Sequence, residues 1–123
     1  MTSAETVDAF IHALERKDFD AACALITDDC EYDNVPMSKV YGPAGLRSVL
    51  EPFFAGCTAL EWVVHHQAET GDVVMNERTD RFEMGGRWIG LDVAGVFVLR
   101  DGKIALWRDY FDQGMFTKAM TGA

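Results

Sequence analysis

The spacing of apolar side chains predicts helices at the start of the chain. Apolar residues recur there at i, i+3, i+4 and i+7, which places them on one face of a helix. The first helix runs through residue 16, and the Ser3 side chain can cap its start. Asp18 can cap a second, short helix, which Asp28-Asp29 would end.

The next segment predicts one strand and a third helix. Residues 30–35 alternate between polar and apolar, as a strand does, and stop at Pro36. Residues 41–43 open the third helix, which carries an apolar stripe with Pro43 in its first turn. Pro52 should end or kink this helix, because proline removes a backbone hydrogen bond.

From residue 58 onward the pattern changes to strands separated by short turn signals. The predicted strands cover residues 60–68, 72–84, 87–99 and 103–111. Turns as short as Gly85-Gly86 and Asp101-Gly102 imply antiparallel hairpins. Helices first and strands last indicate one α+β domain over residues 1–123. Such long strands favour a curved, mostly antiparallel sheet wrapped around the N-terminal helices, a cone with an internal pocket.

Charge and composition exclude several classes of partner. The net charge of −9 argues against nucleic acid and anionic membranes as partners. No apolar run reaches the roughly 20 residues of a membrane span, and the N-terminus has no secretory pattern. Three cysteines without CxxC spacing predict neither disulfides nor a zinc site, and so a cytoplasmic setting. His65 and His66 are adjacent on a strand and face opposite sides, so no metal site is expected.

Strand alternation places charged side chains on faces that also carry apolar ones. Arg78 and Asp80 share a face, and at about 6.5–7 Å between their backbones the arginine can reach the carboxylate. On the last strand, Asp109 shares a face with Trp107 and Phe111. Alternation alone leaves open which face is inside, and charged pairs on strands are most often solvated.

The first strand adds polar groups of a different kind. Tyr32 and Asn34 share one face, and Asp33 points the other way. The strand 87–99 contributes apolar walls, including Leu91 and Val93. If these faces converge, they form an apolar cavity with a small polar cluster, which is the usual form of a ligand site.

Three motifs carry a resemblance to a known family. "EYDNVP" (31–36), "NERTDRF" (76–82) and "GKIALWRDYFD" (102–112) resemble the limonene-1,2-epoxide hydrolase family, within the NTF2-like and SnoaL-like cone fold. The resemblance spans nearly the whole chain. It implies a dimer that needs no metal or organic cofactor. It also implies addition of water to a small hydrophobic, cyclic or terpene-like epoxide, giving a vicinal diol.

The resemblance also implies a role for each matching residue. Asp80 would protonate the epoxide oxygen, and Asp109 would take a proton from water, in one step without a covalent intermediate. Arg78 would lie between the two carboxylates, and Tyr32 and Asn34 would help to hold the water. The implied substrate-binding wall consists of Leu50, Phe82, Leu91, Val93, Trp107, Phe111 and Phe116.

Two other functions stay open on the sequence alone. A ketosteroid-isomerase-like or SnoaL-like cyclase of the same fold would use one Asp as a base. A non-catalytic module that binds a small molecule would use Arg78, Asp80 and Asp109 as a structural ion cluster.

Overall fold

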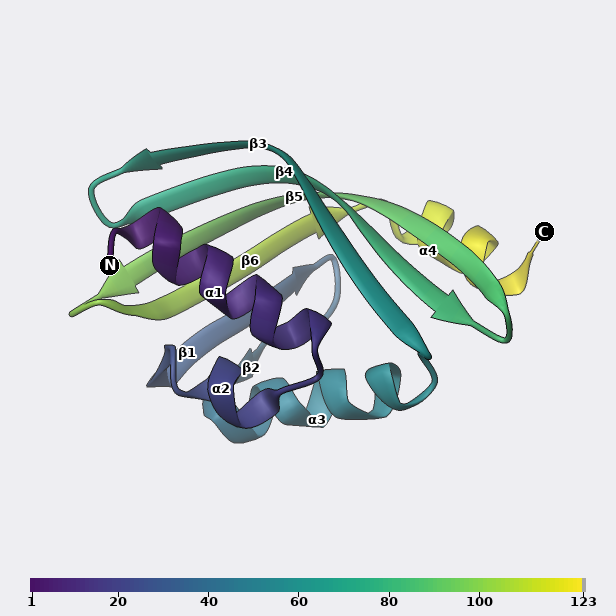
Figure 1. Ribbon diagram of the computed structural model, residues 1–123, viewed down its shortest axis with the longest axis horizontal. Helices are drawn as coiled ribbons and strands as arrows, with labels where there is room; N and C mark the ends of the chain where they lie inside the picture. The colour runs from purple at the N-terminus through teal and green to yellow at the C-terminus, as the bar shows by residue number, and fades with distance from the viewer. Residues whose placement is uncertain (123) are drawn as a thin grey trace.

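The computed structural model describes residues 1–122 as a curved six-stranded sheet with helices packed against it (Figure 1). The helices are α1 (Ser3–Glu15), α2 (Phe19–Cys23), α3 (Gly42–Ala55) and α4 (Gln113–Thr121). The strands are β1 (Ile26–Val35), β2 (Val40–Tyr41), β3 (Ala59–Thr70), β4 (Val73–Met84), β5 (Arg87–Arg100) and β6 (Lys103–Phe111). Their order across the sheet is β2-β1-β6-β5-β4-β3. Only the β1–β6 pair is parallel among these strands, so the expected α+β class and the mixed, mostly antiparallel sheet are confirmed.

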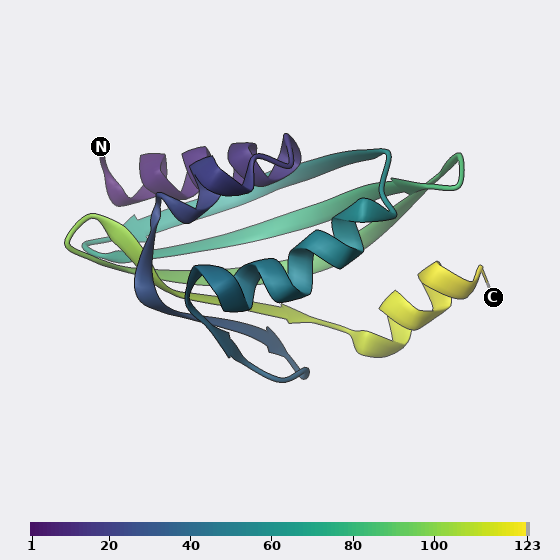
Figure 2. The ribbon, with the colours of Figure 1, turned by 90° about the horizontal axis from the view of Figure 1, so that it is seen from below.

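The core lies between the sheet and the first three helices. Figure 2 shows α1 and α3 on the same side of the sheet, with α4 beyond the end of β6. Val7, Phe10 and Leu14 of α1 are fully buried, as the periodicity of this segment predicts. No helix in residues 1–122 combines the length and apolar character needed to cross a membrane.

The start of α1 differs from the prediction by one residue. Thr2, and not Ser3, is the N-cap: its side chain accepts from Glu5 N, and the Glu5 carboxylate accepts from Thr2 N. This reciprocal capping box satisfies two backbone donors that helix geometry leaves free. Ser3 Oγ instead donates to Gly71 O (2.9 Å). The predicted cap at Asp18 is confirmed, since its carboxylate accepts from Ala21 N (3.0 Å).

Pro52 does not end α3. The helix continues to Ala55, and Leu50 and Phe54 on either side of the proline are both buried in the core. We infer that burial of this apolar face outweighs the backbone hydrogen bond that proline cannot make.

Three elements depart from the sequence pattern. β1 begins at Ile26, so Asp28-Asp29 lies within a strand and does not end α2. β2 pairs only with β1, and its two residues are too few to give a periodic signal in the sequence. α4 was not predicted. None of its described residues is buried, and a helix without a buried face has only a weak apolar stripe in the sequence.

Candidate active site

A row of paired residues crosses the inner face of the sheet. Gln67 of β3 pairs with Asn76 of β4, and Asn76 pairs with Gly95 of β5. Gly95 in turn pairs with Asp109 of β6, which lies opposite Asn34 of β1. Neighbouring strands are about 4.8 Å apart, so four polar side chains and one glycine line up across five strands.

Arg78 reaches over this row and joins the two carboxylates. Its Nε and Nη2 donate to Asp80 Oδ1 (2.9 Å) and Oδ2 (3.0 Å). The same Nη2 donates to Asp109 Oδ2 (2.8 Å), and Nη1 donates to Asn76 Oδ1 (2.8 Å). All four side chains are buried, and Arg78 is only 1% exposed. The arginine therefore lies between the two acids, in the arrangement that the resemblance implied.

Trp107 holds Asp109 from the other side. Trp107 Nε1 donates to Asp109 Oδ1 (2.9 Å), so both carboxylate oxygens accept a hydrogen bond from an N–H group. The indole stacks between the Tyr32 ring, at 4.1 Å between centroids, and the Phe97 ring, at 6.1 Å. Trp107 is fully buried behind the cavity and does not line it, contrary to the expectation of a wall residue. Its N–H is held by Asp109, which keeps the ring in the core.

Tyr32 and Asn34 lie beside Asp109 because β1 and β6 are parallel. Asn34 Nδ2 donates to Tyr32 Oη (2.8 Å). The Tyr32 O–H proton and the Asn34 carbonyl oxygen then remain for other partners. Tyr32 can donate to a water that in turn donates to Asn34 and Asp109. Asp33 points away from this group and pairs with Arg108 Nε (2.9 Å), as strand alternation predicted.

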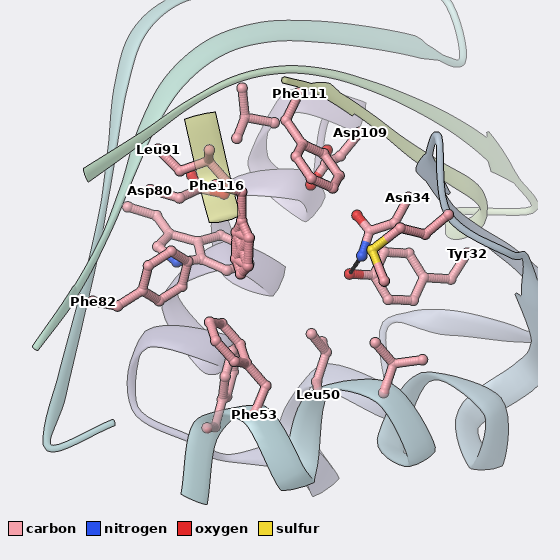
Figure 3. A pocket seen from close by; sticks show the side chains of 15 residues that line it. Tyr32, Asn34, Leu50, Phe53, Asp80, Phe82, Leu91, Asp109, Phe111 and Phe116 are labelled. Carbon is pink, nitrogen blue, oxygen red and sulfur yellow. Dashed lines mark hydrogen bonds between the residues drawn. The ribbon is translucent and has the colours of Figure 1, made fainter. Parts of the chain in front are cut away.

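These groups open onto a cavity of about 240 Å³ (Figure 3). Both carboxylates, Asp80 and Asp109, are on its wall, whereas Arg78 is behind them. The expected wall residues Leu50, Phe82, Leu91, Val93, Phe111 and Phe116 line it. The sequence analysis did not assign Met37, Val49, Phe53, Phe54 and Trp62, which also line it. Val49 and Phe53 had a usable signal, since they lie on the apolar stripe of α3.

Burial shapes the protonation of the site. The pKa of Asp80 is raised to about 6. Burial is the main cause, the neighbouring Arg78 opposes it, and the charge of Asp109 adds to the increase. Burial also raises the pKa of Tyr32, with a further contribution from Asp109, so the phenol keeps its proton. Asp80 can therefore hold a proton up to about pH 6, where an ordinary Asp is ionised.

The buried thiols and the potential metal ligands among the described residues do not form a second site. Burial raises the pKa of the Cys30 thiol to about 12 and also raises that of Cys57, which disfavours a reactive thiolate. Within residues 1–122, no three His, Cys, Asp or Glu side chains are grouped so that they could hold a metal ion.

Comparisons with known proteins agree with this geometry. A family model described as the limonene-1,2-epoxide hydrolase catalytic domain matches residues 1–121. The chain is 39% identical over 106 residues to epoxide hydrolase EphG of Mycobacterium tuberculosis (strain ATCC 25618 / H37Rv), covering 86% of this chain and 70% of that protein.

Solved structures also match this chain. An LEH-like epoxide hydrolase of M. tuberculosis matches with a TM-score of 0.83 at 36% identity, over 98% of this chain and 90% of that one. A putative SnoaL-like polyketide cyclase from Shewanella putrefaciens CN-32 matches with a TM-score of 0.88 at 13% identity, over 98% and 97% of the two chains. At that identity the second match shows the fold alone.

Proposed function

Because the chain belongs to the limonene-1,2-epoxide hydrolase family, we propose that it adds water to a small hydrophobic epoxide and releases a vicinal diol. One observation carries the proposal: two buried carboxylates share Arg78 Nη2 at the wall of an apolar cavity. Opening an epoxide needs a proton for the leaving oxygen and a base for the attacking water. Two carboxyl groups in opposite protonation states supply both.

Asp80 is the proposed general acid. Its raised pKa supports a neutral carboxyl at the start of the reaction. As the C–O bond of the epoxide breaks, the oxygen takes the Asp80 proton and becomes a hydroxyl.

Asp109 is the proposed general base. Its two oxygens accept from Arg78 and Trp107, which is the hydrogen-bonding pattern of an ionised carboxylate. A water held by Tyr32, Asn34 and Asp109 attacks the epoxide carbon and gives its proton to Asp109. The cycle closes when that proton returns to Asp80 through water in the cavity. No residue forms a bond to the substrate, and no metal or organic cofactor takes part in this scheme.

The cavity supports the substrate class. A cavity of about 150 Å³ holds benzene, so 240 Å³ suits one ring with a few additional carbons. The apolar and aromatic wall favours a cyclic or terpene-like epoxide without charge.

Isotope labelling tests the mechanism directly. Excess enzyme reacts with epoxide in ¹⁸O-water for less than one turnover, and the diol and protein are analysed by mass spectrometry. We expect ¹⁸O in the diol from the first turnover. Label in Asp80 or Asp109 would mean a covalent ester and would refute the one-step scheme.

Substitution separates hydrolysis from the rival functions. Asp80→Asn and Asp109→Asn should each remove nearly all diol formation while the protein stays folded, and the exposed Asp92→Asn on β5 should not. A one-base isomerase needs no arginine between two carboxylates, so a 3-oxo-Δ5-steroid should show no turnover beside a cyclic epoxide. A non-catalytic module would convert neither compound.

A homodimer and a cytoplasmic setting complete the proposal. The outer face of the sheet exposes Met75, Trp88 and Tyr110, which supports contact with a second copy. Sedimentation equilibrium should give twice the 13.7 kDa chain mass, and a monomer at micromolar concentration would contradict the dimer. The cysteines are free thiols, which is consistent with a reducing compartment.

A further inference from the structure

A chain of hydrogen bonds leads from the Arg78 guanidinium to the N-terminal helix. Arg78 Nη1 donates to Asn76 Oδ1 (2.8 Å), and Asn76 Nδ2 donates to Gln67 Oε1 (3.0 Å). Gln67 Nε2 donates to Asp8 Oδ1 of α1 (3.0 Å). We propose that Asn76 and Gln67 are positioning residues, which hold the guanidinium in the orientation that lets one nitrogen serve both carboxylates. This inference rests on the proposed hydrolase function.

The direction of this chain is fixed at both ends. A guanidinium can only donate hydrogen bonds, and an ionised carboxylate can only accept them. Asn76 must therefore turn its carbonyl oxygen toward Arg78, and Gln67 must turn its NH₂ group toward Asp8. Each amide between them has one orientation that satisfies its neighbours, so Arg78 Nη1 meets an acceptor in a fixed place.

An irregularity in β3 brings Gln67 into the chain. Val64 pairs with Arg78, but His66 pairs with Glu77, so β3 holds one extra residue at this point. Strict alternation from Val64 would turn residue 66 inward and Gln67 outward. The extra residue reverses the alternation and puts Gln67 opposite Asn76 on the inner face. Bulges of this kind commonly re-aim a side chain next to an active site.

Asn76 supplies Arg78 Nη1 with an uncharged hydrogen-bond acceptor. The Nε and Nη2 groups of Arg78 already serve Asp80 and Asp109. A buried Nη1 without an acceptor would favour rotation of the guanidinium, which would take Nη2 away from one of the acids. A neutral amide accepts the hydrogen bond and adds no negative charge beside the pair, whereas a third carboxylate would disfavour the ionised form of Asp109 that its role as base requires.

Neither amide lines the cavity, so their effect should fall on kcat and spare KM. We expect Asn76→Leu to lower kcat about 10- to 100-fold, because small displacements of catalytic groups have effects of that size. Gln67→Leu should lower it less. The double variant should be no slower than Asn76→Leu, since both residues act through one chain. Glu77→Gln, on the outer face next to Asn76, is the matched control and should keep the wild-type kcat.

Three outcomes would overturn the inference. They are a kcat for Asn76→Leu within about twofold of wild type, losses in the double variant that multiply, or an equal loss in Glu77→Gln. Rates are expressed per folded molecule, measured by circular dichroism of each sample. Gln67→Leu alters only a half-buried side chain, so it carries the kinetic test if Asn76→Leu does not fold.

A measurement without substrate separates this inference from the proposed function. ¹⁵N NMR of the wild-type protein should show resolved, slowly exchanging Nη protons for Arg78, and Arg78→Lys assigns them by their loss. In Asn76→Leu, or in Gln67→Leu, the Nη1 protons should broaden or exchange faster, and an unchanged signal would count against the positioning role. If the wild-type protein hydrolyses no epoxide, the proposed function fails and this comparison alone decides the inference.

Discussion

Replacing Gly95 by alanine tests whether the site depends on the absence of a side chain at that position. Gly95 lies between Asn76 and Asp109 in the row across the sheet. An added Cβ would lie 2.4 Å from Arg78 Nη1, 2.8 Å from Asp109 Oδ1 and 2.9 Å from Asn76 Oδ1. Real Cβ atoms essentially never come closer than 3.0 Å to another heavy atom, so three polar groups of the site must shift.

The displacement of Arg78 determines how much turnover Gly95→Ala should lose. Arg78 Nη1 would need to move by about 1 Å to reach an ordinary contact, and misplacement by that much can lower turnover about 100-fold. Overpacking in a well-packed interior costs about 1–3 kcal/mol of unfolding free energy. Gly95 does not have a positive φ, so its backbone suits alanine and the effect comes from the side chain alone. We expect a folded protein with kcat/KM about 100-fold lower.

The assay combines initial rates on a cyclic epoxide with unfolding in urea. Gly90→Ala on the same strand is the matched control, because its Cβ would meet Thr79 Cγ2 at 3.5 Å, an ordinary contact. Turnover by Gly95→Ala within about threefold of wild type would refute the reasoning, since it would mean that Arg78 can move without consequence. A similar loss in Gly90→Ala would show that the effect does not come from the site.

Three further predictions follow from the same geometry. The folded state binds the Asp80 proton more tightly than the unfolded state does, so this stabilisation is complete below pH 4 and lost above about pH 6. Relative to Asp80→Asn, the unfolding free energy of wild type in urea should therefore fall by roughly 3 kcal/mol over that range, and parallel curves would contradict the shift. Trp107→Phe removes the second hydrogen bond to Asp109 and should lower kcat about 10-fold with KM unchanged in steady-state rates. Phe116→Ala opens the cavity beside Phe111, so a panel of epoxides of increasing size should show better kcat/KM for the larger ones.

Strand alternation determined which side chains share a face. Arg78 and Asp80 are two residues apart, as are Trp107 and Asp109, and each pair faces the same side because successive strand residues point in opposite directions. That rule acts within one strand and does not depend on its neighbours. The sequence by itself therefore placed both acids beside apolar residues and turned Asp33 away. The helical spacing of α1 likewise identified its buried face.

The tertiary structure decided which side chains from different elements come into contact. Parallel pairing of β1 with β6 brings Asn34 next to Asp109, and the extra residue in β3 turns Gln67 inward. Packing keeps α3 helical through Pro52, and the hydrogen bond to Asp109 holds Trp107 behind the cavity wall. These features arise from contacts between residues far apart in the chain, and a pattern read along one segment carries no information about them.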